Sequence, residues 1–309
     1  MAIVLIRKDG KLGLWKKAFL DQYPSLPVYH FEEEHPAEKI TMAVVWKHPK
    51  GSLKAYPNLK CIASFGAGVD FIFGDPTRPE GVPITRVVDD ALANDMAEYV
   101  ITAIMGHLKN MDQYARDQEK GLWQPRPYSR IADHTIGIMG IGTLGTQLAD
   151  KLRVMGFRII GWSKNPKELP GVHVFHGIES RREFLSKSTV LVCLLPLTPE
   201  TKKILNQQTL SQLPHGAFLI NVARGGHLEE GDLIPLLDSG QLSGACLDVF
   251  EEEPLPSGHL FWEHPKIRIT PHVASVSDPQ SVVPQLAENF FRLREGKELR
   301  NQVDLQQGY

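Results

Sequence analysis

Residues 134–155 constrain the fold more than any other stretch of this sequence. The apolar run His134–Met139 is predicted to be a strand, and it leads directly into Gly140-Ile141-Gly142-Thr143-Leu144-Gly145. An amphipathic helix follows, with apolar residues at 148, 152 and 155. Glycines in this pattern allow a tight turn, a close backbone approach to a bound group, and close packing of helix on strand. The unit therefore predicts a dinucleotide site in which the start of the helix holds the diphosphate, at Gly140, Gly142, Thr143, Leu144 and Gly145.

The chain beyond residue 134 keeps alternating apolar runs with helical stretches. Runs that are apolar throughout, rather than at every second residue, are typical of a parallel sheet covered on both faces. We therefore predict an α/β fold with a Rossmann-type doubly wound parallel sheet. The runs are Thr135–Met139, Phe157–Trp162, Val172–Phe175, Val190–Leu195, Ala217–Val222, Gly244–Val249 and Ile267–Thr270. The first hundred residues also alternate, with strands predicted at Ala2–Ile6, Thr41–Trp46 and Leu59–Phe65 and a helix at Gly13–Leu20.

Two longer helices are predicted from apolar spacing. Apolar residues recur every three or four positions from Leu92 to Ala115, which indicates one helix of roughly 25 residues, capped at Asn94 or Asp95 and stopped at Gly121. A second is predicted over residues 278–296, and Pro284 leaves its start open.

Composition excludes several classes of protein. The 309 residues carry 34 Lys+Arg against 36 Asp+Glu, a net charge of −2, so we expect no nucleic-acid partner. No apolar run approaches the roughly 18 residues of a membrane span, and the N-terminus lacks the pattern of a signal peptide. The three cysteines are far apart in the sequence and the histidines lack metal-ligand spacing. We therefore expect a cytoplasmic protein with reduced thiols, no membrane contact and no metal.

The turn after the second predicted strand of this region bears on the choice of dinucleotide. An NAD-selective site places an acid there for the ribose 2′-hydroxyl, but this chain has Ser163-Lys164-Asn165-Pro166-Lys167 and no acid before Glu168. A hydroxyl and two ammonium groups suit a 2′-phosphate. Ser163, Lys164 and Lys167 therefore predict NADP(H) as the preferred cofactor, with NAD(H) possible; the alternative is a solvated basic turn.

Three polar residues follow successive predicted strands. Arg224, Glu253 and His272 come after the strands ending near residues 222, 249 and 270. Parallel strands share a carboxyl edge, where ligands bind. An arginine can anchor a carboxylate, a histidine can protonate a carbonyl oxygen during hydride transfer, and a neighbouring acid can orient the imidazole. Each residue alone has an alternative structural or solvated role, so the prediction depends on their joint placement.

Five motifs, in this order, resemble those of the D-isomer-specific 2-hydroxyacid dehydrogenases. They are the glycine turn at 140–145, Leu195-Pro196-Leu197-Thr198-Pro199-Glu200-Thr201, Asn221-Val222-Ala223-Arg224-Gly225, Leu247-Asp248-Val249-Phe250 with Glu253-Pro254, and Thr270-Pro271-His272-Val273-Ala274. Within that family, Trp46, Phe65–Asp70, Trp123-Gln124-Pro125, Trp162-Ser163 and the tail from Gln302 resemble the branch that reduces glyoxylate and hydroxypyruvate. The resemblance covers essentially the whole chain.

The resemblance implies roles for particular residues. Arg224 would bind substrate, Glu253 would pair with His272, and His272 would be the acid/base. Asp248 would hold the nicotinamide carboxamide. The other cofactor residues implied are Leu195, Pro196 and Ala223, and the other substrate residues are Trp46, Ala67 and Gly68. Trp46 has core packing as an equally good alternative, and backbone N–H groups at 66–69 could form a concavity for a carboxylate.

The resemblance also implies an organisation and an activity. Residues 1–98 and 276–309 would form a smaller, flavodoxin-like α/β substrate domain, residues 99–275 the dinucleotide-binding domain, and two chains a homodimer. The implied activity is NADPH-dependent reduction of small 2-oxo acids, glyoxylate to glycolate and hydroxypyruvate to D-glycerate. The alternative from another class is a dinucleotide-sensing, corepressor-like binding module without physiological turnover.

Overall fold

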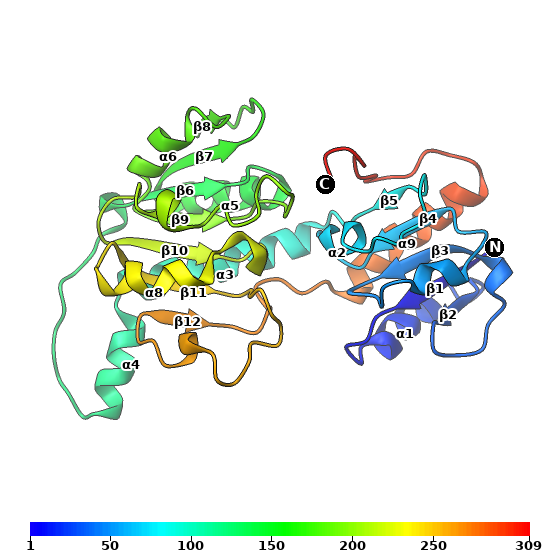
Figure 1. Cartoon of the computed structure of the whole chain (residues 1–309), viewed down its shortest axis with the longest axis horizontal. Helices are drawn as coiled ribbons and strands as arrows, with labels where there is room; N and C mark the ends of the chain where they lie inside the picture. Colours follow the sequence, from blue (N-terminus) through cyan, green and yellow to red (C-terminus); the bar gives the residue numbers. More distant parts are fainter. The chain divides into compact units, whose positions relative to one another are not determined.

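The computed structural model describes all 309 residues and divides into two compact units (Figure 1). Unit 1 comprises Met1–Leu92 and Val276–Tyr309, so both ends of the chain contribute to it, and unit 2 comprises Ala93–Ser275. The division lies inside helix α3 (Asp90–Leu108), between residues 92 and 93, whereas the sequence analysis placed it between 98 and 99.

Unit 1 is built on a five-stranded parallel sheet with the order β2-β1-β3-β4-β5. This is the flavodoxin-like strand order, and it confirms the predicted fold class for this unit. One face of the sheet packs against α1 and α9, and the other against short helices that follow β3 and β4. The elements are β1 (Ala2–Ile6), α1 (Leu12–Gln22), β2 (Val28–His30), η1 (Ala37–Lys39), β3 (Ile40–Val45), η2 (Ser52–Ala55), β4 (Cys61–Ser64), α2 (Asp70–Phe73), β5 (Ile84–Thr85) and α9 (Pro279–Arg294).

Unit 2 is built on a seven-stranded parallel sheet with the order β12-β11-β10-β9-β6-β7-β8. The order reverses between β6 and β9, as in a Rossmann fold. Apolar residues of α3 and α5 pack on one face, and those of α6 and α8 on the other (Figure 1). The elements after α3 are α4 (Met111–Glu119), η3 (Ile131–Asp133), β6 (Thr135–Met139), α5 (Thr143–Val154), β7 (Arg158–Ser163), β8 (His173–His176), α6 (Arg181–Lys187), β9 (Val190–Cys193), α7 (Gln207–Leu210), β10 (Ala217–Asn221), η4 (Gly225–His227), α8 (Glu230–Asp238), β11 (Leu242–Leu247), η5 (Leu260–Trp262) and β12 (Ile267–Ile269).

The single long helix predicted from Leu92 onward is wrong. The segment forms two helices, α3 and α4, separated where Asn110 adopts a left-handed conformation with φ 55°. Asparagine tolerates this conformation better than most residues, so it can break a helix that the apolar spacing would continue. The predicted cap is also wrong: Asp89 Oδ1 accepts the Ala91 N–H at 3.1 Å, and Asp95 lies inside α3.

Helix α9 contains Pro284, the residue because of which the sequence did not define where this helix begins. Asp278 caps α9 by accepting the Gln280 N–H at 3.2 Å, and Pro284 lies within the helix. A proline has no N–H for the carbonyl four residues earlier, and the side chain of Gln22 donates to that Gln280 oxygen at 3.4 Å. A residue from the other end of the chain thus supplies the missing donor.

Two further findings concern the chain as a whole. All three cysteines are buried and carry free thiols. None of the helices has both the length and the apolar character needed to cross a membrane.

Candidate active site

The glycine turn between β6 and α5 has the shape that a dinucleotide site requires. Gly140 has φ 106°, and a Cβ at Gly145 would lie 2.1 Å from the Gly140 carbonyl oxygen, so the helix packs directly on the turn. A Cβ at Gly142 would meet nothing within 4 Å. Gly142 and Thr143 are exposed, and Leu144 is half-buried. The first N–H groups of α5 are therefore open to an anion.

The basic turn after β7 adjoins the glycine turn. β7 pairs with β6 in parallel and ends at Ser163, whose hydroxyl donates to the Asn165 carbonyl at 2.6 Å. The Lys167 amine donates to the Ile141 carbonyl within the glycine turn. Lys164 is largely exposed, with its amine 3.8 Å from the Glu200 carboxylate. The structure thus brings Lys167 and the glycine turn together.

The loop after β9 flanks the other side of the glycine turn. The Leu194 N–H donates to the Met139 carbonyl at 2.8 Å, which places Leu195 and Pro196 next to the end of β6. The Pro196 carbonyl accepts the Thr201 hydroxyl at 2.7 Å. Leu195 is buried and Pro196 is half-buried.

The turn that carries Arg224 packs on the turn that precedes Glu253. A Cβ at Gly225 would lie 1.8 Å from the carbonyl carbon of Phe250, so only glycine permits this approach. The Asn221 side chain supports the turn by accepting the Ala223 N–H at 3.3 Å and donating to the Arg224 carbonyl at 3.1 Å. The Arg224 guanidinium donates to the Ala223 carbonyl at 2.6 Å.

His272 and Glu253 form a hydrogen-bonded pair. His272 Nδ1 lies 2.8 Å from Glu253 Oε2, and the two side chains are 25% and 16% exposed. Glu253 Oε1 accepts the Phe250 N–H at 3.1 Å. An acceptor on Nδ1 fixes the orientation of the ring. The structure therefore joins the turns after β10, β11 and β12 through Gly225, Phe250, Glu253 and His272.

Asp248 holds the backbone around His272. Its side chain is buried, Oδ1 accepts the Thr270 hydroxyl at 2.6 Å and the Val273 N–H at 2.8 Å, and Oδ2 accepts the Ala274 N–H at 2.9 Å. His272 between them has φ 54°, a conformation that costs free energy for a non-glycine residue. The carboxylate thus stabilises a strained turn, and its contact with a nicotinamide stays a prediction.

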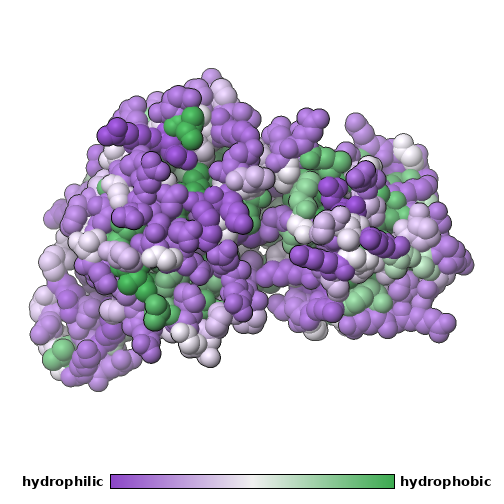
Figure 2. All heavy atoms as spheres, in the orientation of Figure 1, coloured by the Kyte–Doolittle hydropathy of each residue, from purple (hydrophilic) through white to green (hydrophobic).

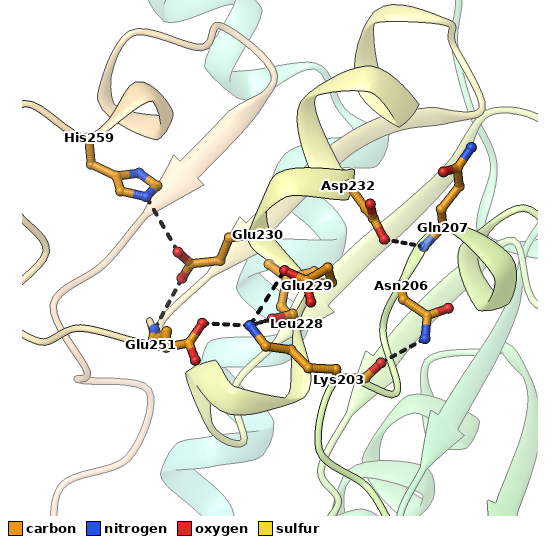
Figure 3. A network of polar contacts seen from close by, with 9 residues as sticks. All are labelled: Lys203, Asn206, Gln207, Leu228, Glu229, Glu230, Asp232, Glu251 and His259. Atoms are coloured by element: carbon orange, nitrogen blue, oxygen red, sulfur yellow. Dashed lines mark hydrogen bonds and ion pairs between the residues drawn. The ribbon is translucent and has the colours of Figure 1, made fainter.

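A polar network that the sequence analysis missed supports the same turns (Figure 3). Lys203 donates to Glu251 Oε2 at 2.5 Å and to the Leu228 carbonyl at 3.0 Å. Glu230 accepts the Glu251 N–H at 3.1 Å, and its other oxygen lies 3.4 Å from His259 Nε2. Partial burial opposes the charge on Lys203, but the hydrogen bond and the charges of the nearby glutamates raise its pKa overall. Lys203 and Glu251 are too far apart in the chain for any local sequence pattern to reveal the contact.

The predicted substrate residues of unit 1 lie at the carboxyl edge of its sheet. Trp46 follows β3, packs edge-on against Phe71 with ring centroids 5.3 Å apart, and would lie 3.7 Å from a Cβ at Gly66. Ala67 and Gly68 belong to the loop after β4, where the Ser64 hydroxyl donates to the Gly68 carbonyl at 2.7 Å. The structure brings Trp46 and this loop together within unit 1, whereas Arg224 belongs to unit 2.

Comparison with known proteins agrees with this geometry. The sequence profile described as "D-isomer specific 2-hydroxyacid dehydrogenase, NAD binding domain" matches residues 101–274. The chain is 42% identical over 316 residues to a glyoxylate/hydroxypyruvate reductase A from Yersinia enterocolitica, with 100% of both chains covered.

Two solved structures are similar over nearly their whole length. One is a D-isomer specific 2-hydroxyacid dehydrogenase from Xanthobacter autotrophicus in complex with NADPH and MES, with a TM-score of 0.94, 38% identity, and 100% and 99% coverage of this chain and that one. The other is an NADPH-dependent glyoxylate/hydroxypyruvate reductase from Sinorhizobium meliloti with NADP and sulfate, with a TM-score of 0.94, 35% identity and 100% coverage of both chains. From the five motifs, the strand orders and these relatives, we conclude that the chain belongs to the D-isomer specific 2-hydroxyacid dehydrogenase family.

Proposed function

We propose that this protein is an NADPH-dependent reductase of small 2-oxo acids, with glyoxylate and hydroxypyruvate as its first substrates. The observation that carries the proposal is the 2.8 Å contact of His272 with Glu253, in turns that pack against the Arg224 turn. The relatives with the same full-length architecture are named for this activity. The relatives reported above give no support to the alternative of a corepressor-like module without physiological turnover.

Arg224, His272 and Glu253 have different roles in the proposed reduction. The nicotinamide, when bound, supplies the hydride. The Arg224 guanidinium binds the substrate carboxylate with two donors. The protonated His272 ring donates from Nε2 to the carbonyl oxygen, while Nδ1 stays hydrogen-bonded to Glu253. Glu253 thereby keeps the ring oriented through the proton transfer.

The preference for NADPH over NADH follows from the turn after β7. Gly140, Gly142, Thr143, Leu144 and Gly145 would hold the diphosphate at the open N-terminus of α5. Ser163, Lys164 and Lys167 offer a hydroxyl and two cations to a 2′-phosphate, and no acidic residue occurs between positions 163 and 167 of the chain. Leu195, Pro196, Ala223 and Asp248 would contact the nicotinamide half.

Unit 1 is proposed as the substrate domain. The backbone N–H groups around Ala67 and Gly68 form the kind of loop that binds an anion, and Trp46 packs beside it. The Trp46 ring would limit the space beside this loop, which suits a two- or three-carbon acid.

We also propose a homodimer that forms through helix α4 and the loop after it. Hydrophilic residues cover most of the face drawn in Figure 2, yet Met111, Leu122, Trp123 and Tyr128 expose between 45% and 94% of their surface. The chain after α4 runs back to β6 as a long loop at the outer edge of unit 2 (Figure 1). Because these exposed apolar side chains all belong to one segment of the chain, we propose this segment as the interface. Sedimentation of wild-type and Trp123→Ser protein tests this, and a wild-type monomer would refute it.

The proposed compartment is the cytoplasm, because three buried free thiols fit a reducing environment.

The decisive experiment measures NADPH oxidation by its absorbance with glyoxylate, hydroxypyruvate and larger 2-oxo acids. We expect turnover with the two small acids and a higher kcat/KM for NADPH than for NADH. His272→Asn is expected to abolish turnover and leave NADPH affinity within about twofold, since the ring acts on the substrate oxygen. Absence of oxidation with every acid tested contradicts the proposed function.

A further inference from the structure

We infer that His227 is a positioning residue that restrains the Arg224 turn through one ring nitrogen and the Pro196 loop through the other, and so positions both the substrate-binding guanidinium and the cofactor loop. The inference rests on the proposed function and adds a residue that the sequence motifs do not single out. His227 is the last residue of the short helix η4, which begins directly after Arg224. Its side chain is completely buried.

The two ring nitrogens of His227 reach two different loops. Nδ1 lies 3.2 Å from the backbone nitrogen of Arg224, and Nε2 lies 3.3 Å from the carbonyl oxygen of Pro196. Arg224 follows β10 and Pro196 follows β9, and these strands are neighbours in the sheet. A single buried ring therefore spans the gap between the two loops.

The partners determine which nitrogen carries the proton. A carbonyl oxygen only accepts, so Nε2 must donate to Pro196. In a neutral ring Nδ1 is then unprotonated and accepts the Arg224 N–H. The Arg224 carbonyl, 3.1 Å from Nδ1, has other donors in the Asn221 side chain at 3.1 Å and the His227 N–H at 3.2 Å. With the neutral Nε2–H tautomer, both ring nitrogens, the Arg224 N–H and the two carbonyl oxygens therefore each have a hydrogen-bond partner.

This arrangement is more than core packing. An apolar side chain of the same volume would remove the acceptor that His227 offers to the partly buried Arg224 N–H. The backbone of Arg224 is also held by Asn221, and the Pro196 carbonyl by the Thr201 hydroxyl at 2.7 Å. His227 adds one hydrogen bond to each of these supports, and each bond restrains its own loop.

Two substitutions separate the two contacts. In His227→Gln the amide nitrogen can reach the position of Nε2 and keep the donor to Pro196, but the acceptor for Arg224 is lost. In His227→Asn the amide oxygen can take the position of Nδ1 and keep the acceptor for Arg224, but the donor to Pro196 is lost. The readouts are the Kd of NADPH from fluorescence, the KM of glyoxylate, and kcat.

We expect one variant to weaken the binding of glyoxylate and the other to weaken the binding of NADPH. H227Q raises the KM of glyoxylate about three- to tenfold and leaves the Kd of NADPH within about twofold, because one hydrogen bond at the substrate side is removed. H227N raises the Kd of NADPH by a similar factor and leaves the KM of glyoxylate nearly unchanged. His107→Gln is the matched control: His107 stacks on Phe218 of β10 with centroids 3.8 Å apart, so its loss is expected to lower the Tm only.

Equal effects of H227N and H227Q on both constants, or effects on the Tm alone, would overturn the inference. If neither variant folds, the ¹⁵N shifts of the His227 ring in the wild-type protein decide: an unprotonated Nε2 refutes it and an unprotonated Nδ1 supports it. If wild-type protein binds NADPH but reduces no 2-oxo acid, the proposed function fails alone. The NADPH affinities of the two variants still decide the role of His227.

Discussion

Replacing Asp248 by asparagine tests whether its carboxylate holds His272 in place. The side chain accepts three hydrogen bonds, two on Oδ1 from Thr270 and Val273 and one on Oδ2 from Ala274. Asparagine has the same shape but only one oxygen. The amide oxygen can keep the two bonds at Oδ1, and the NH2 group then faces the Ala274 N–H, so that two donors oppose each other.

The size of the effect follows from these bonds. A hydrogen bond to a charged acceptor contributes about 1.5–3 kcal/mol, so Asp248→Asn is expected to lower the free energy of unfolding by about 2 kcal/mol. The turn also loses a restraint that keeps His272 at φ 54°. A displacement of about 1 Å in a catalytic group can cost about 100-fold in rate, and we expect kcat to fall between about tenfold and 100-fold.

The assay combines urea unfolding with NADPH oxidation in the presence of glyoxylate. Thr189→Val is the control, because Thr189 precedes β9 at the opposite, amino edge of the same sheet, where its hydroxyl accepts the Thr135 N–H at 2.9 Å. That variant is expected to lose about 1–2 kcal/mol of stability and keep its kcat.

Two results would refute this reasoning. An Asp248→Asn protein with lower stability but normal kcat would show that the bonded turn does not orient His272. A protein with normal stability and kcat but weaker NADPH binding would assign Asp248 to the cofactor instead.

Three other predictions follow from particular contacts. Gly225→Ala places a Cβ 1.8 Å from the Phe250 carbonyl carbon, so we expect a loss of about 3 kcal/mol of stability together with lower activity; an unchanged Tm would contradict the close approach. Ser163→Asp is expected to raise the KM of NADPH about tenfold or more through charge repulsion and to lower that of NADH, and steady-state kinetics with an unchanged ratio of kcat/KM values would argue against this turn as the 2′-phosphate site. Burial lowers the pKa of His107 from 6.5 to about 4, so the unfolded chain binds a proton that the folded protein excludes, and stability falls as the pH is lowered. Between pH 7.5 and pH 5, the free energy of unfolding of His107→Phe, measured in urea titrations, should fall by about 2 kcal/mol less than that of the wild type. An equal fall in both proteins would contradict this assignment.

Local sequence was enough for most of the fold. The apolar runs that were predicted as strands lie in the two sheets within one or two residues of their predicted ends, as Thr135–Met139 does, because a parallel strand covered on both faces must be apolar throughout. The prediction failed where one residue outweighed a periodic pattern, as Asn110 did between α3 and α4. The predicted cap of α3 was wrong for a different reason: several acidic residues lie near the start of the helix, and each could have been the cap.

Only part of the candidate site could be predicted from local sequence. The sequence alone determined the strand–glycine–helix unit, the basic turn after it, and the residue types at three strand ends, because each depends on neighbours a few positions away. Only the tertiary structure decided that Asp248 supports the His272 turn, that Gly225 packs on Phe250, and that His227 connects Arg224 with Pro196. These contacts join loops after different strands, and whether two such loops meet depends on strand order and on loop conformation, which no spacing along the chain encodes.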